Sequence, residues 1–108
     1  MKTAIAIPPV TAILLDLAWQ EGVPLHDILP ARMGGFRLRA AVAWAARAAE
    51  AGTFPEIGEA LGGRHHTTIM HAVFRADQMR EADPDFLALT DRLARRARAR
   101  RALYGGNP

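Results

Sequence analysis

The sequence predicts an all-α fold, a small multi-helix domain that contains a helix-turn-helix. Hydrophobic residues make up 50% of the 108-residue chain and aromatic residues only 6%, and alanine is abundant. This composition favours closely packed helices over a β-sandwich. Apolar residues recur at helical spacing in several segments, and residues 54–75 have the pattern of two helices joined by a tight glycine turn. A chain of this length is expected to form one compact domain.

Charge and cysteine content restrict the class of protein further. The chain has no cysteine, which excludes disulfides and thiolate metal sites and is compatible with a reducing cytoplasm. Residues 1–91 contain 8 basic and 11 acidic side chains, whereas residues 92–108 contain 6 arginines and no acidic side chain. Such a basic end attracts polyanions. No apolar run is long enough to span a membrane, and we interpret the apolar N-terminus as a helix start, not a signal peptide.

The N-terminal half is predicted to contain two helices. Residues 1–9 are expected to form a flexible arm, and the first helix should run from residue 10 to about 20, where Gly22 ends it. Trp19 is expected to pack against its neighbour. Residues 23–29 should form a link with a short helical turn, and the glycine-rich residues 31–36 a loop. The second helix is predicted over residues 38–51, with Trp44 as a core anchor and Gly52 at its end.

The helix-turn-helix is predicted from three local signals. Thr53 and Glu56 have the spacing of a capping box, and Pro55 suits the first helical turn. Gly62 and Gly63 can adopt positive φ and allow a sharp turn. A second helix should then run from about 65 to 81, opening with five hydrogen-bonding side chains: Arg64, His65, His66, Thr67 and Thr68. Polar residues at the start of a recognition helix can reach base edges and phosphates in the major groove.

The last helix is predicted from Pro84 to about Leu103. Asp83 is a suitable N-cap, and the apolar stripe of this helix consists of Phe86, Leu89, Leu93 and Ala97. Six arginines crowd its second half: Arg92, Arg95, Arg96, Arg98, Arg100 and Arg101. We interpret them as an auxiliary surface for phosphates or for a protein partner, with a disordered solubilising end as the alternative. The domain would thus span residues 10–103, and residues 104–108 would be a frayed tail.

Three sequence elements, occurring in order and without gaps, resemble a known family. They are PEIG at 55–58, GGRHHTT at 62–68 and IMHA at 69–72. Together they resemble the C-terminal DNA-binding domain of the bacterial replication initiator DnaA, which has a Trp-repressor-like fold. The resemblance covers about residues 10–96 and includes nothing of the initiator's ATPase domain. It implies double-stranded DNA as the partner, at DnaA-box-like sites.

The resemblance also implies roles for individual residues. Arg37 would enter the minor groove, and Arg39 would contact the DNA backbone. Arg64 would reach a phosphate. In the major groove, bases and phosphates would be contacted by His66, Thr67 and Thr68. His65 replaces the family's usual Asp, so the preferred site is expected to differ from the family's TTATNCACA box. His71 is expected to have a packing or capping role. Candidates for auxiliary phosphate contacts are Arg32, Arg95, Arg96 and Arg98.

The predicted function is sequence-specific binding of double-stranded DNA by the helix at 65–81, with a minor-groove or phosphate contact from Arg37. The protein would regulate transcription or replication initiation without the initiator's ATPase, in the cytoplasm at the nucleoid. The alternative is a protein–protein adaptor that keeps the fold but does not bind DNA. No P-loop or G-x-S-x-G motif is present, so we expect no enzyme activity and no cofactor. The histidines do not share one helical face, so no metal site is predicted, and a monomer is slightly favoured because no heptads are found.

Overall fold

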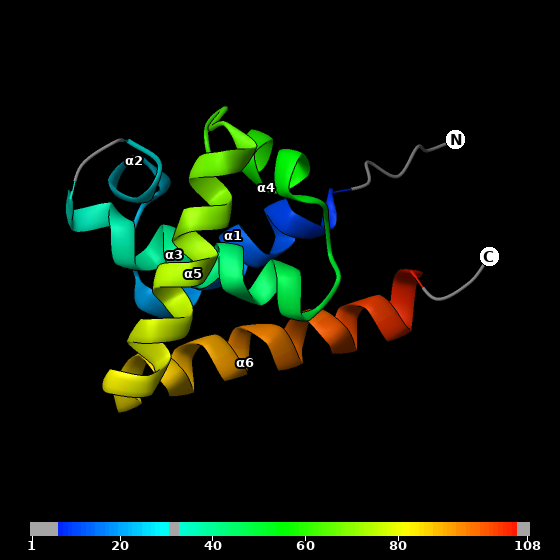
Figure 1. Cartoon of the computed structure of the whole chain (residues 1–108). Coiled ribbons are helices and arrows are strands. Elements are labelled where there is room, and N and C mark those ends of the chain that lie inside the picture. The colour runs from blue at the N-terminus through cyan, green and yellow to red at the C-terminus, as the bar shows by residue number, and fades with distance from the viewer. Residues whose placement is uncertain (1–6, 31–32, 106–108) are drawn as a thin grey trace.

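The computed structural model describes residues 7–30 and 33–105, and its regular elements are all helical (Figure 1). The α-helices are α1 (Pro9–Glu21), α2 (Leu25–Ile28), α3 (Met33–Ala48), α4 (Phe54–Ala60), α5 (His66–Ala82) and α6 (Pro84–Arg100), and α6 continues into a π-helical turn, η1 (Arg101–Gly105). The predicted all-α class is therefore confirmed. Most of the predicted arm, residues 1–6, and the end of the predicted tail, residues 106–108, lie outside the described residues.

Helix α3 forms the centre of the domain and contacts all five other α-helices. Figure 1 shows α5 crossing in front of α3, with α6 running along one side of both. The side chains of α3 explain this position, because small residues let neighbouring helix axes approach closely. Seven hydrophobic residues in α3 or just after it are buried: Ala40, Ala41, Val42, Ala43, Ala45, Ala46 and Ala49. The sequence pattern indicated only part of this set, since alanine marks an apolar face weakly.

The predicted apolar stripe of the last helix is confirmed, and the first helix also buries one face. Their buried residues are Val10, Ile13, Leu14 and Leu17 on α1, and Phe86, Leu89, Leu93 and Ala97 on α6. The prediction for Trp19 is wrong, because its side chain is 85% exposed at the surface of α1. Trp44 is half-buried and links two helices: its Nε1 donates to Asp77 of α5 at 2.8 Å, and the Arg80 guanidinium lies 3.8 Å from its ring centre.

Residues 33–36 are helical, which corrects the predicted loop over 31–36. Gly35 explains the difference. A Cβ at this position would lie 2.8 Å from the Ile28 carbonyl oxygen and 2.9 Å from that of Asp27. The residue is therefore glycine because α2 packs against the helix backbone there, and not because the chain bends. The helix also ends earlier than predicted, at Ala48, where Glu50 adopts φ 54° and the Ala51 N–H donates to the Ala46 carbonyl at 2.8 Å.

Asp16 attaches the C-terminal half of α6 to α1. Its side chain is only 7% exposed, and it accepts from Arg96 at 2.8 Å, from Arg100 at 3.3 Å and from Gln20 at 3.0 Å. Burial alone would raise the pKa of this carboxyl, but the hydrogen bonds from Arg96, Gln20 and Arg100 outweigh it and hold the pKa below the ordinary aspartate value. The carboxylate therefore stabilises the fold above that ordinary value, and the contribution is lost as the pH falls through the lowered pKa.

We expect Asp16→Asn to lower the free energy of unfolding by about 1.5 kcal/mol at pH 7, the typical cost of losing a charged hydrogen-bond acceptor. The difference between the wild type and the variant should shrink as the pH falls through the lowered pKa of Asp16, because the wild-type carboxyl then becomes protonated too. Urea unfolding at several pH values measures this. A variant as stable as the wild type at pH 7 would contradict the assignment.

Candidate nucleic-acid interface

Helices α4 and α5 form the predicted helix-turn-helix. The capping box is present: Thr53 Oγ1 accepts from the Glu56 amide at 3.2 Å, and the Glu56 carboxylate accepts from the Thr53 amide at 2.8 Å. The turn has Gly62 at φ 95° and Gly63 at φ 80°, values that residues with a Cβ rarely adopt. The amides of Gly63 and Arg64 both donate to the Gly58 carbonyl, at 3.0 and 2.8 Å, and so fasten the turn to α4.

Gly58 sets how closely the turn packs on α4. A Cβ at this position would lie 2.0 Å from the carbonyl oxygen of Arg64, a distance at which backbone atoms must move. The glycine of the PEIG element is thus a contact point for the residue that precedes α5. Close contact here fixes the direction in which α5 leaves the turn.

The start of α5 is capped by a histidine. His65 is the N-cap residue, and its Nδ1 accepts from the Thr67 amide at 3.2 Å and also pairs with the Thr67 hydroxyl. Since Nδ1 accepts the amide proton, the neutral ring carries its own proton on Nε2. The first turn of α5 therefore presents an imidazole donor at a helix N-terminus whose Thr67 and Thr68 amides are bonded to His65. The His66 ring lies next to that of His65, with ring centres 4.3 Å apart.

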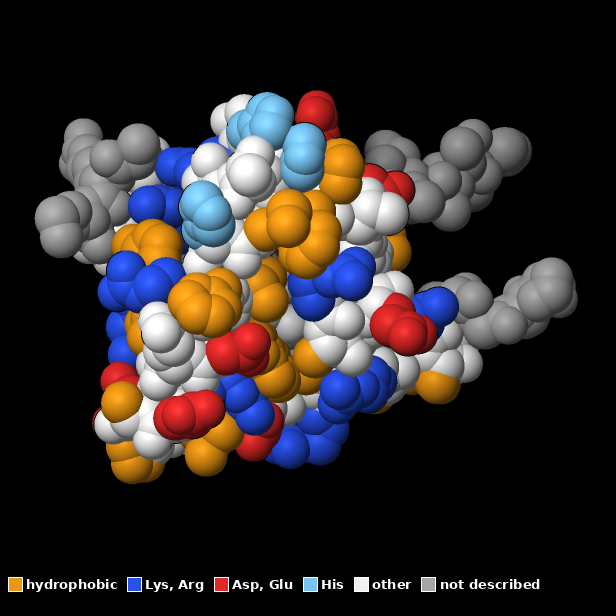
Figure 2. All heavy atoms as spheres, in the orientation of Figure 1, with side chains coloured by type: hydrophobic (Ala, Val, Ile, Leu, Met, Phe, Trp, Pro, Cys, Tyr) orange, Lys and Arg blue, Asp and Glu red, His pale blue; other side chains and the backbone are white. Residues whose placement is uncertain are grey.

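The polar side chains at this end of α5 are all accessible. His65, His66, Thr67 and Thr68 are exposed. Figure 2 shows histidine side chains gathered at the end of the molecule where α5 begins. His71, for which a packing or capping role was predicted, is also exposed one turn further on. The buried residues of α5, which pack against the core, are Ile69, Ala72 and Ala76.

The outer face of α5, opposite this buried stripe, consists of Thr67, Met70, His71, Phe74 and Gln78. These residues recur at intervals of three and four, so their side chains line one side of the helix. Arg75 flanks the outer face and is exposed, with its guanidinium 5.7 Å from the ring centre of Phe36 at the start of α3. The sequence analysis did not single out Arg75, although it lies seven residues after Thr68 on the same side of a helix.

Arg64 lies at the turn but points back onto the fold. Its side chain is half-buried, and Nη1 donates to the Leu61 carbonyl at the end of α4. A cation at a helix C-terminus is favourable because it meets the negative end of the helix dipole. The structure thus uses Arg64 to close α4, and its predicted phosphate contact stays a prediction.

Arg39 has a structural role inside the fold, which corrects the prediction that it contacts the DNA backbone. The side chain is 9% exposed and donates to the carbonyls of Ile28 at 2.8 Å and Pro30 at 2.6 Å. Burial, together with the nearby charge of Arg64, lowers the pKa of the Arg39 guanidinium from its ordinary value. Because these bonds satisfy carbonyls at the end of α2, Arg39 connects α2 to α3 instead of facing solvent.

Arg37 lies far from the start of α5. It forms an ion pair with Asp83 at 2.6 Å, and its guanidinium lies 5.1 Å from the Phe86 ring centre. The hydrogen bond from Arg37 is the main cause that lowers the pKa of the Asp83 carboxyl. Asp83 caps the other end of α5, whose 17 residues span about 26 Å. The structure therefore does not bring Arg37 together with the exposed polar residues near Thr67.

The C-terminal arginines are mostly engaged within the fold. Arg96 pairs with Asp16, and Arg98 donates to the Ala48 carbonyl at 3.1 Å. Arg101 donates to the carbonyls of Ala49 and Glu50 at 3.0 and 2.9 Å, so the end of α3 is closed by arginines of α6 and η1. Of the candidates for auxiliary phosphate contacts, Arg95 is exposed, while Arg32 lies outside the described residues.

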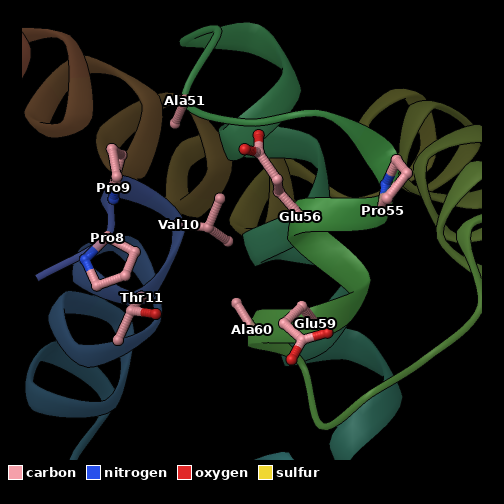
Figure 3. A pocket seen from close by; sticks show the side chains of 9 residues that line it. All are labelled: Pro8, Pro9, Val10, Thr11, Ala51, Pro55, Glu56, Glu59 and Ala60. Carbon is pink, nitrogen blue, oxygen red and sulfur yellow. The ribbon is translucent and has the colours of Figure 1, made fainter.

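A groove of about 430 Å³ lies between the start of α1 and helix α4 (Figure 3). Its walls are mainly apolar, and Figure 3 shows Glu56 and Glu59 as the charged groups from α4. Glu56 is already bound in the capping box.

In the part of the chain that the structure describes, no three histidine, cysteine or acidic side chains are grouped to hold a metal ion. Nor does any helix of residues 7–30 and 33–105 combine the length and apolar character needed to cross a bilayer.

Comparison with known proteins points to one protein in several bacteria. The chain is 64% identical over 31 residues to the chromosomal replication initiator protein DnaA of Methylobacillus flagellatus, which covers 29% of this chain and 7% of that protein. It is 48% identical over 44 residues to DnaA of Dechloromonas aromatica, and this match covers 41% of this chain and 10% of that protein. It is 44% identical over 48 residues to DnaA of a Caulobacter species, and this match covers 44% of this chain and 10% of that protein.

These matches support a DnaA-like C-terminal domain in this chain, in agreement with its all-helical fold. The matched residues span about a tenth or less of the length of these relatives. No family model matches the chain.

Proposed function

We propose that this protein binds double-stranded DNA with sequence preference, by placing the N-terminal turn of α5 in a major groove. The observation that carries the proposal is the accessible set His65, His66, Thr67 and Thr68 at a capped helix start. The positive end of the helix dipole favours phosphate there, and short polar side chains suit base edges. The similarity to the replication initiator DnaA supports a DnaA-like DNA-binding domain in this chain.

His65 and Thr67 have different proposed roles in base recognition. Because His65 uses Nδ1 to cap the helix, Nε2–H remains as a donor, which suits an acceptor such as guanine N7 or O6, or a phosphate oxygen. The Thr67 methyl can pack on a thymine methyl while its hydroxyl keeps the bond to His65. The pair would act as one unit, so that the helix cap also orients the groups that read the bases.

Backbone contacts are proposed for the basic residues on the flanks. Arg75 is exposed beside the outer face of α5, about 10 Å along the helix from Thr68. The positions of Arg37 and Arg39 favour structural roles, so Arg75 is the better candidate for a phosphate on this side. At DnaA-box-like sites, binding of this kind would regulate transcription or replication initiation, as a binding activity and not as catalysis.

We expect Thr67→Ala to weaken binding to a preferred duplex about tenfold, the cost of one lost base contact. Fluorescence anisotropy measures this, and circular dichroism checks that the helix content is unchanged. Thr11→Ala on α1 is the matched control and should bind like the wild type. Equal affinity of the folded Thr67→Ala protein would contradict the proposed major-groove contact.

A protein–protein adaptor is the second candidate, and one observation favours it. Met70 and Phe74, on the outer face of α5, are 44% and 63% exposed, and such side chains often mark contact surfaces. An adaptor would show no preference for any duplex over a scrambled control. The accessible polar turn that precedes these residues makes DNA the better-supported partner.

A further inference from the structure

The outer face of α5 carries a large aromatic side chain where a solvated helix would be polar. Phe74 is 63% exposed, and Met70, one turn before it, is 44% exposed. Neither is needed to close the core, because Ile69, Ala72 and Ala76 already pack against it. Two large apolar side chains four residues apart form one continuous patch on a helix. This patch is an unexplained feature of the surface on which the proposed function depends.

The patch follows the base-reading turn along the same side of the helix. Thr67, Met70 or His71, and Phe74 are spaced by three and four residues, so they face the same direction. From Thr67 to Phe74 the helix rises by about 10 Å, which corresponds to at most about three base pairs of B-DNA because a helix in the major groove is inclined to the DNA axis. If Thr67 contacts one base pair, Phe74 lies over the groove within about three base pairs of it.

The charges around the patch favour DNA as its occupant. Residues 61–76 contain two arginines and three histidines but no acidic side chain, and the next residue, Asp77, has its carboxylate bound to Trp44 Nε1 at 2.8 Å. An apolar side chain in a basic surrounding fits the major groove, because the thymine C5-methyl is an apolar group set among phosphates. Phenylalanine is one of the side chains that can contact this methyl.

We propose that Phe74 reads a thymine through its C5-methyl group, within about three base pairs of the position contacted by Thr67. This inference rests on the proposed function and adds to it a second point of recognition. The contact is apolar and uses no donor or acceptor. It would therefore discriminate thymine from cytosine by the methyl, and it would also accept 5-methylcytosine.

The test uses duplexes in which one thymine at a time is replaced by deoxyuridine, which lacks only the methyl. The full chain is titrated against a DnaA-box duplex, this series of uracil duplexes and a scrambled duplex, by fluorescence anisotropy. The same series is run with Phe74→Ala, with Phe74→Leu, and with Leu87→Ala as the control, since Leu87 is an exposed leucine on α6. Circular dichroism confirms that each variant is folded, which is expected because these side chains are exposed.

The expected result in the wild type is a loss of about fourfold at the thymine contacted by Phe74, the affinity equivalent of one buried methyl group, separate from any loss at the thymine contacted by Thr67. At the position contacted by Phe74, Phe74→Ala should bind the thymine and uracil duplexes with equal affinity. Phe74→Leu should keep part of the affinity difference between the two duplexes, and Leu87→Ala should keep all of it.

Two results would overturn this inference and leave the proposed function standing, provided that the wild type prefers the box. In the first, Phe74→Ala loses affinity on uracil substitution at the same positions as the wild type. In the second, uracil substitution lowers the affinity of the wild type at no position. If the box is bound no better than the scrambled duplex, both the inference and the proposed function are overturned.

Discussion

Replacing Gly58 by alanine is expected to lower the free energy of unfolding by about 3 kcal/mol, the upper part of the usual range for overpacking. The added Cβ would lie 2.0 Å from the Arg64 carbonyl oxygen and 3.5 Å from Cγ1 of Ile69. The first of these neighbours is backbone, so the turn itself must shift. The two amide bonds from Gly63 and Arg64 to the Gly58 carbonyl would then lengthen or break.

Gly34→Ala is the matched control for Gly58→Ala. Gly34 is exposed in the first turn of α3, and a Cβ there would meet nothing within 4 Å. Alanine has the higher helix propensity, so this variant should be as stable as the wild type or more stable by up to about 1 kcal/mol. Thermal unfolding should show a loss of more than about 10 °C for Gly58→Ala and none for Gly34→Ala. Equal melting temperatures would show that the turn does not pack on α4 as described.

Arg39→Met is expected to cost about 3 kcal/mol, because the carbonyls of Ile28 and Pro30 would lose their charged donor. Methionine fills a similar volume, so the loss reports hydrogen bonding more than packing. We expect α2 to detach first, since it has only four residues and depends on this contact. Hydrogen exchange should then show the Leu29 amide, which donates to the Leu25 carbonyl at 2.9 Å, losing protection before the amides of α3.

Arg95→Met supplies the comparison for Arg39→Met. Arg95 is exposed on α6, so removing its charge should change the free energy of unfolding by less than about 0.5 kcal/mol. If Arg39→Met were equally neutral, Arg39 would not have the structural role assigned to it. It would then return to the set of arginines available for DNA.

Local sequence signals predicted the starts of α4 and α6 and the turn between α4 and α5. The capping box of α4, the glycine turn and the Asp83 cap of α6 each depend on a few neighbouring residues, and all three are present in the structure. The buried stripes of α1 and α6 were predictable for the same reason, since one helical period determines them. The exposed polar turn at the start of α5 also follows from local spacing.

The roles of the arginines depend on tertiary neighbours and were not predictable in this way. Arg39 was expected at the surface but lies buried, because α2 folds back and presents its carbonyls to it. Arg37 meets Asp83 across 46 residues of sequence, and Arg96 meets Asp16 across 80. Gly35 misled the prediction of a loop, since glycine can mark a close contact as well as a turn.

The central claim, that the start of α5 reads base sequence in double-stranded DNA, is tested most directly by binding to two duplexes across a salt series. A labelled DnaA-box duplex and a scrambled duplex of equal length are titrated by fluorescence anisotropy between about 50 and 200 mM salt. We predict a preference for the box that persists as salt weakens the binding of both duplexes, because base contacts depend less on salt than phosphate contacts. Binding that is equal for the two duplexes at every salt concentration, or absent at the lowest, would contradict the claim.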